Sequence, residues 1–179
     1  MADPNIGATA LGEFQLISMA PRRGHDIASA CEQSLGIALP PPGKWRTANG
    51  LRLVCVTPDQ WMALRDGSTL FDDLASALGR AATMIDLSAS FVAVRVSGAG
   101  ARDALTKFLP LDLHPRAMQP GDAAATVAAH LPIVMWQQDE APTYDLLCPR
   151  SLASSFHRML RLAGIAPLDA PSLQPQAPM

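Results

Sequence analysis

The chain has 179 residues, of which 49% are hydrophobic and 17% charged, and its formal net charge is -2. This length is enough for one large domain, or for two small units that share a core. Lysine and arginine are scattered, so the chain offers no basic stripe to neutralise the phosphates of a nucleic acid. The longest apolar run, 131–136, is far shorter than the ~20 residues of a membrane-spanning helix.

The N-terminal residues lack the basic and apolar stretches of a secretory signal, which favours a cytoplasmic protein. The apolar composition has two explanations, a large internal core or a surface that a partner covers. The three cysteines, Cys31, Cys55 and Cys148, are an odd number without C-x-x-C spacing, so neither a disulfide framework nor a zinc site is predicted. Each lies in an apolar segment, where a free cysteine packs as a small hydrophobic residue.

The first half of the chain is predicted to alternate strands and helices. Aliphatic and β-branched content predicts strands over 14–20, 51–56 and 83–87, and helical spacing of apolar residues predicts helices over about 25–35 and 71–78. Gly36 fits the C-terminal cap of the first helix, and Thr69 with Asp72 resembles a capping box at the start of the second. Three prolines and a glycine at 40–43 predict an extended loop between them.

A similar order begins again in the second half. The run 91–96 alternates Val92, Val94 and Val96 on one face, which predicts a half-buried strand. Ala101, Ala104, Leu105 and Phe108 have the spacing of a short helix, and two or three strands are expected between 124 and 148. A last helix is expected to begin at a Ser151 cap and to end at Gly164, with a buried stripe formed by Leu152, Phe156, Met159, Leu160 and Ala163.

These elements predict an α+β protein with two ferredoxin-like halves. The expected organisation is a flexible N-terminus over 1–12, a single compact domain over 13–164, and a Pro-rich disordered tail over 165–179. Within the compact domain the halves are expected over about 13–88 and 89–164.

The sequence lacks the common catalytic motifs, including the nucleophile elbow, the H-E-x-x-H zinc motif and the phosphate-binding loop. The run Ser97-Gly98-Ala99-Gly100 resembles a dinucleotide-binding loop, but Asp103 stands where that pattern needs a small residue. A tight turn between strand and helix is the alternative. The four histidines are not at metal-ligand spacing from one another. No catalytic, cofactor-binding or metal-binding residue is therefore predicted.

Three residues are candidates for a protein interface. Trp45 and Trp61 are large aromatic side chains of the kind that carry binding energy at interfaces, although core packing explains each equally well. His114 lies in the loop LPLDLHP at 109–115, where either a partner contact or a hydrogen-bonded loop histidine fits.

Six segments, in order and at matching spacing, resemble the gamma subunit of heterotetrameric sarcosine oxidase. They are PDQW at 58–61, DLS at 86–88, VRVSGAGAR at 94–102, LPLDLHP at 109–115, PG at 120–121 and PRS at 149–151. The resemblance covers roughly residues 50–163, and the first fifty residues match only in general layout. It implies a fold similar to the folate-binding domain of aminomethyltransferases such as the glycine-cleavage T-protein.

The resemblance also implies a function, that of a non-catalytic subunit contributing assembly and structural support. Complexes of this family demethylate sarcosine oxidatively to glycine, pass the one-carbon unit to tetrahydrofolate and form peroxide. FAD, FMN, NAD and tetrahydrofolate are then expected in partner subunits and none in this chain, the partners being larger alpha and beta subunits and a small delta subunit.

Two other functions stay open. The kinship with aminomethyltransferases raises a stand-alone folate-binding protein, but the stretch 131–136 has no carboxylate where the T-protein pattern has an acidic residue that contacts folate. Asp139 and Glu140 come later, in an expected hairpin turn. A ferredoxin-like domain that binds a small ligand is the third hypothesis.

Overall fold

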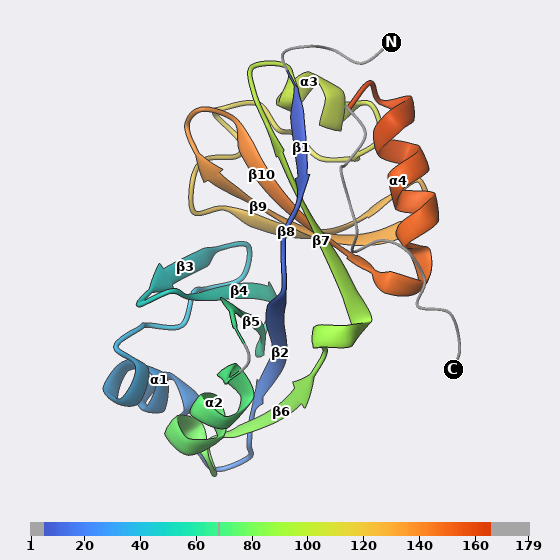
Figure 1. Cartoon of the computed structure of the whole chain (residues 1–179). Coiled ribbons are helices and arrows are strands. Elements are labelled where there is room, and N and C mark those ends of the chain that lie inside the picture. The colour runs from blue at the N-terminus through green and yellow to red at the C-terminus, as the bar shows by residue number, and fades with distance from the viewer. Residues whose placement is uncertain (1–5, 68, 166–179) are drawn as a thin grey trace, which may run out of the picture. The chain divides into compact units, whose positions relative to one another are not determined.

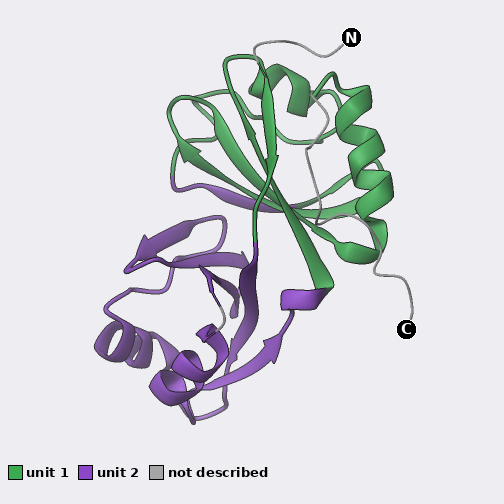
Figure 2. Ribbon diagram, viewed as in Figure 1, with its two compact units in different colours: residues 1–12, 90–120, 126–179 green, residues 13–89, 121–125 purple. Residues whose placement is uncertain are grey.

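The computed structural model describes residues 6–67 and 69–165 of the chain, which divides into two compact units (Figure 2). Unit 1 comprises residues 1–12, 90–120 and 126–179, and unit 2 comprises residues 13–89 and 121–125. The division near residue 89 lies close to the expected boundary between the two halves. Each unit, however, also includes a short segment from the other half of the chain, 1–12 in unit 1 and 121–125 in unit 2.

Unit 2 is built on a five-stranded sheet with the order β3-β4-β5-β2-β6, in which every paired strand is antiparallel. Its strands are β2 (Phe14–Pro21), β3 (Trp45–Ala48), β4 (Leu51–Thr57), β5 (Gln60–Asp66) and β6 (Ala82–Asp86). Its helices are α1 (Ile27–Leu35), α2 (Leu70–Leu78) and the single turn η1 (Ser88–Ser90). Figure 1 shows α1 and α2 together on one side of this sheet.

The core of unit 2 lies between these two helices and the sheet. Ile27 and Cys31 from α1 and Leu70, Leu74 and Leu78 from α2 are all buried in it. The sheet contributes one side of each strand, with Ile17, Met19, Leu53, Cys55, Trp61 and Ala63. The helical spacing of apolar residues therefore identified Ile27, Cys31, Leu74 and Leu78 correctly, whereas Leu70 is buried although the predicted helix did not include it.

The ends of α1 follow from local chemistry. Asp26 is the N-cap, and its Oδ1 accepts hydrogen bonds from the backbone N–H groups of Ala28 (3.0 Å) and Ser29 (3.1 Å). Gly36 ends the helix with φ 65°, the left-handed conformation that glycine adopts without steric cost. The predicted C-terminal cap is thus confirmed.

The predicted capping box of α2 is wrong. Thr69 is the N-cap residue, but its side chain makes no capping hydrogen bond. The Thr69 hydroxyl donates to Asp73 Oδ2 (3.2 Å) and accepts from Arg65, while Gln15 on β2 accepts the hydrogen bond of the Leu70 N–H. A residue on a strand, distant in sequence, therefore satisfies one of the free N–H groups at the start of α2.

Unit 1 is built on a second five-stranded sheet with the order β1-β7-β10-β9-β8. Its strands are β1 (Gly7–Ala10), β7 (Phe91–Ser97), β8 (Ala123–Ala128), β9 (Leu131–Asp139) and β10 (Thr143–Pro149). Its helices are α3 (Ala101–Thr106), η2 (Arg150–Leu152) and α4 (Ala153–Leu162). Strand β8 begins among residues that belong to unit 2. The two-sheet α+β layout agrees with two ferredoxin-like halves.

The valines predicted on one face of β7 are buried, with Val94 and Val96 at 0% exposure. Gly98 has φ 108° in the turn that follows, so the SGAG run forms the tight connection between β7 and α3. In α4 the side chains of Phe156, Met159 and Leu160 are buried as expected.

Three expectations for unit 1 need correction. Residues 7–10, expected to be flexible, form β1 and pair antiparallel with β7, with Gly7 opposite Ser97. Ser151 does not cap the last helix, because residues 150–152 form η2 and the N-cap of α4 is Leu152, without a side-chain bond. The helix expected to reach Phe108 ends at Thr106. Residues 166–179 of the expected tail lie outside the described residues.

Candidate functional site

The two tryptophans proposed for an interface are largely covered within this chain. Trp61 is 8% exposed, belongs to the core of unit 2, and donates a hydrogen bond from Nε1 to the backbone oxygen of Pro40 at 2.9 Å. Trp45 is 9% exposed, and the guanidinium carbon of Arg52 lies 5.6 Å from its ring centroid. Their positions therefore match the core-packing alternative.

His114 is exposed in the loop between α3 and β8. Its backbone N–H donates to Asp112 Oδ1 (2.9 Å), and its Nδ1 accepts from the backbone N–H of Arg116 (3.2 Å). The ring is therefore held by its own loop, as the hydrogen-bonded alternative predicts, while its side chain remains open to solvent. Trp45 and Trp61 belong to unit 2 and His114 to unit 1, so one unit does not hold all three candidates.

A buried charged network in unit 1 was not foreseen from the sequence. Asp145 on β10 has no exposed surface, and its two oxygens accept hydrogen bonds from Arg95 Nε (2.7 Å) and Arg95 Nη2 (2.9 Å) on the paired strand β7. Gln138 Nε2 on β9 donates to the same carboxylate at 2.6 Å. The side chain of Arg95 is 38% exposed, so the network connects a buried carboxylate to solvent through the guanidinium group.

This network bears on the folate-binding alternative. The stretch 131–136 of β9 has no carboxylate, but Asp145 pairs directly opposite Trp136 on the neighbouring strand. The pair of strands β9 and β10 therefore does contain an acidic residue, Asp145. Both of its oxygens are engaged by Arg95 and Gln138, so the carboxylate is built into the sheet.

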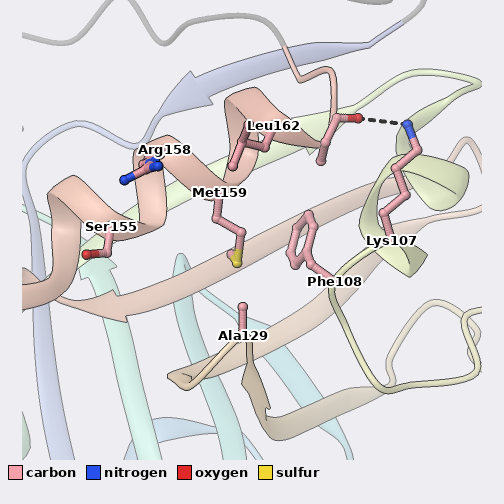
Figure 3. Close-up of a pocket in the computed structure, with 8 residues that line it drawn as sticks. Lys107, Phe108, Ala129, Ser155, Arg158, Met159 and Leu162 are labelled. Carbon is pink, nitrogen blue, oxygen red and sulfur yellow. Dashed lines mark hydrogen bonds between the residues drawn. The ribbon is translucent and has the colours of Figure 1, made fainter.

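An open pocket of about 430 Å³ lies within unit 1 between α4 and the end of α3 (Figure 3). Ser155, Met159 and Leu162 follow i, i+4, i+7 spacing and present one flank of α4 to it. Phe108 follows α3, and Ala129 lies in the two-residue turn between β8 and β9. The remaining lining residues are Lys107, Arg158 and Ala163.

The pocket combines an apolar centre with two cations. Figure 3 shows Lys107 and Arg158 on opposite sides of the group, with Phe108 and Met159 between them. Lys107 Nζ donates to the backbone oxygen of Ala163 at 2.9 Å, which places its charge at the C-terminal end of α4, where a cation is favourable. No lining residue is acidic. Leu162 is 79% exposed, the highest value among the exposed large hydrophobic side chains of the described residues.

Within 6–67 and 69–165 no group of three or more metal-ligating side chains comes together. Across the same residues, no helix has both the length and the apolar character needed to cross a membrane. The three cysteines are buried and free, and burial raises the thiol pKa of Cys31 and of Cys148 to about 11. These thiols stay protonated at neutral pH and behave as packing groups.

A sequence profile of the sarcosine oxidase gamma subunit family matches residues 23–165 of the chain. The chain belongs to this family. Among curated relatives, it is 38% identical over 101 residues to the sarcosine oxidase subunit gamma of Arthrobacter sp. and 33% identical over 102 residues to that of Corynebacterium sp. strain P-1. These alignments cover 55% and 56% of this chain and span only 50% of each relative's length.

Solved structures share the fold. A chain of the heterotetrameric sarcosine oxidase from Corynebacterium sp. U-96, solved with pyrrole 2-carboxylate, superposes with a TM-score of 0.81 over 92% of this chain and 86% of that chain, at 24% identity. Aminomethyltransferase T of the glycine cleavage system from Bartonella henselae superposes with a TM-score of 0.68 over 92% of this chain and 48% of that one, at 14% identity. The expected likeness in fold to aminomethyltransferases is confirmed.

Proposed function

We propose that this chain is the non-catalytic gamma subunit of a heterotetrameric sarcosine oxidase complex, where it supports the assembly and the structure of the complex. The observation that carries the proposal is the family match over residues 23–165. The fold supports it, because 92% of the chain superposes on a chain of a heterotetrameric sarcosine oxidase. The named relatives of this family are subunits.

The complex would demethylate sarcosine to glycine, transfer the one-carbon unit to tetrahydrofolate and form peroxide. In this proposal FAD, FMN, NAD and tetrahydrofolate are bound by the other subunits, which are larger alpha and beta chains and a small delta chain. The buried Arg95–Asp145 pair is an internal brace of unit 1, since Asp145 has no exposed surface for substrate. Among the three candidate interface residues, His114 is the exposed one, so its side chain is available for contact with a partner.

The test is purification of the tagged chain from its native cells at low salt, followed by mass spectrometry, a visible spectrum and an assay for sarcosine-dependent peroxide. Co-eluting larger chains with flavin absorbance and sarcosine turnover are expected. A colourless chain that elutes alone contradicts the proposal. A matched control uses the same tag on an unrelated protein from the same cells, which identifies proteins that bind the resin.

A second candidate function, direct folate binding, is favoured by the fold shared with aminomethyltransferase T. Against it, the one carboxylate beside the stretch 131–136 is held by Arg95 and Gln138. Calorimetry of the isolated chain with tetrahydrofolate separates the two functions. Micromolar affinity would favour the folate-binding function, and the absence of heat at millimolar ligand would favour the subunit.

A further inference from the structure

The pocket between α3 and α4 has exposed apolar and cationic side chains that the described residues of unit 1 leave uncovered. Its apolar side chains are Phe108, Met159 and Leu162, and Leu162 is 79% exposed. In α4 the buried stripe is Phe156, Met159 and Leu160, and Leu162 lies outside that stripe. A leucine at a solvated helix position gives the folded chain little, because the hydrophobic effect stabilises only area that leaves water.

The charges around the pocket identify the kind of partner. Lys107 and Arg158 are both exposed, and neither forms an ion pair with a carboxylate in the described part of the chain. Ion pairs elsewhere in the described residues involve Lys44, Arg65 and Arg95. Since the lining residues include no acid, the pocket presents positive charge on a chain whose net charge is -2.

We propose that this pocket receives an acidic segment of a larger subunit, with an apolar side chain seated between Phe108, Met159 and Leu162 and carboxylates facing Lys107 and Arg158. The inference rests on the proposed function, because the occupant is another chain of the complex. An apolar centre with a charged rim is the usual anatomy of a protein interface. Arg158 offers paired donors to a carboxylate, and Lys107 is already oriented by its bond to Ala163.

The lysine content of the chain gives a direct assay. The sequence has only two lysines, Lys44 and Lys107. A carbodiimide joins a lysine amine to a carboxylate in contact with it, forming an amide with loss of water. In the purified complex we expect a link between Lys107 and an aspartate or glutamate of a larger subunit. Lys107→Arg keeps the charge and should abolish that link, whereas Lys44→Arg should leave it in place.

Variants test the energetics of the same contact. Leu162→Asp and Arg158→Glu should each weaken binding of the larger subunit by about tenfold or more, since both remove attraction and add repulsion toward an acidic occupant. Because both residues are exposed, neither change should alter the thermal stability of the isolated chain by more than a degree or two. Ile85→Asp is the matched control, an exposed aliphatic residue on β6 of unit 2 (58% exposed), and should bind as the wild type does.

The outcomes distinguish this inference from the function on which it rests. If the wild-type chain captures no larger subunit, the proposed function fails and the inference fails with it. If the complex forms but Leu162→Asp and Arg158→Glu bind as the wild type does, the inference alone is wrong. A Lys107 link confined to this chain, or made only to a second copy of it, also overturns the inference.

Discussion

The buried pair in unit 1 predicts an unequal cost for removing its two partners. Asp145 has no exposed surface, whereas the side chain of Arg95 is 38% exposed. Arg95→Met removes two hydrogen bonds and the opposite charge from a carboxylate that stays buried in the sheet, and removing one partner of a buried ion pair costs about 3 kcal/mol or more. Asp145→Leu leaves a guanidinium group that can turn to water, so we expect a smaller loss, about 1–2 kcal/mol.

Urea unfolding of the isolated chain measures this difference. With a slope of about 2 kcal/mol per molar urea, Arg95→Met should lower the midpoint by about 1.5 M and Asp145→Leu by less than about 1 M. Tryptophan fluorescence and circular dichroism can both follow this transition, and Trp136, which pairs opposite Asp145 on the neighbouring strand, is a fluorophore within unit 1. Arg65→Met, which breaks an exposed ion pair, is the control and should leave the midpoint nearly unchanged. Equal losses for the two buried-pair variants, or a larger loss for Asp145→Leu, would show that the burial of each partner does not determine its cost.

Three further predictions concern the rest of the fold. Leu74→Ala should destabilise the chain by about 3 kcal/mol in the same urea assay, because Leu74 has no exposed surface in the core of unit 2; a loss below 1 kcal/mol would contradict that packing. The pKa of Asp26 is lowered by its hydrogen bonds to Ser29, and that of Asp73 by Arg65, so their stabilisation is present above pH 4 and is lost as the pH falls below it. Asp26→Asn should therefore reduce the loss of unfolding free energy as the pH falls below 4. An unchanged loss would argue against capping of α1 by the Asp26 carboxylate. Cys31 and Cys148 should resist thiol reagents at pH 7.5 and react only on unfolding, as mass spectrometry after brief labelling can check; rapid labelling of the folded chain would contradict their burial.

Periodic segments were predictable because the spacing of their apolar residues along the sequence predicts which side chains are buried. The alternating valines of β7 are buried as the pattern predicted, and so are Leu74 and Leu78 of α2. Strand β1 was not predictable, because the sequence Gly-Ala-Thr-Ala has little strand propensity and the strand is held by pairing with residues 94–97. Strand β5 was missed for another reason, since four consecutive residues in it are buried and no alternation is visible.

The candidate site likewise depends on contacts between residues that are far apart in the sequence. Asp145 reads as an ordinary polar residue within an apolar run, and its partner Arg95 lies 50 positions earlier, so only the strand pairing brings the two together. The pocket draws on three separate segments, none of which has a motif of its own. One signal was present in the sequence, because Leu162 falls outside the buried stripe of its helix. Trp45 and Trp61 could not be assigned to core or interface by residue type alone, and their burial favours the core.

We propose above that this chain works as one subunit of a sarcosine-oxidising complex. Native mass spectrometry of the assembly purified through the tagged chain tests it most directly, because a single spectrum gives the mass of every subunit and of each cofactor bound without a covalent bond. We expect one copy of this chain together with an alpha, a beta and a delta chain, with flavin released from the larger chains only. A spectrum containing this chain alone, as monomer or homodimer, would contradict the proposed function.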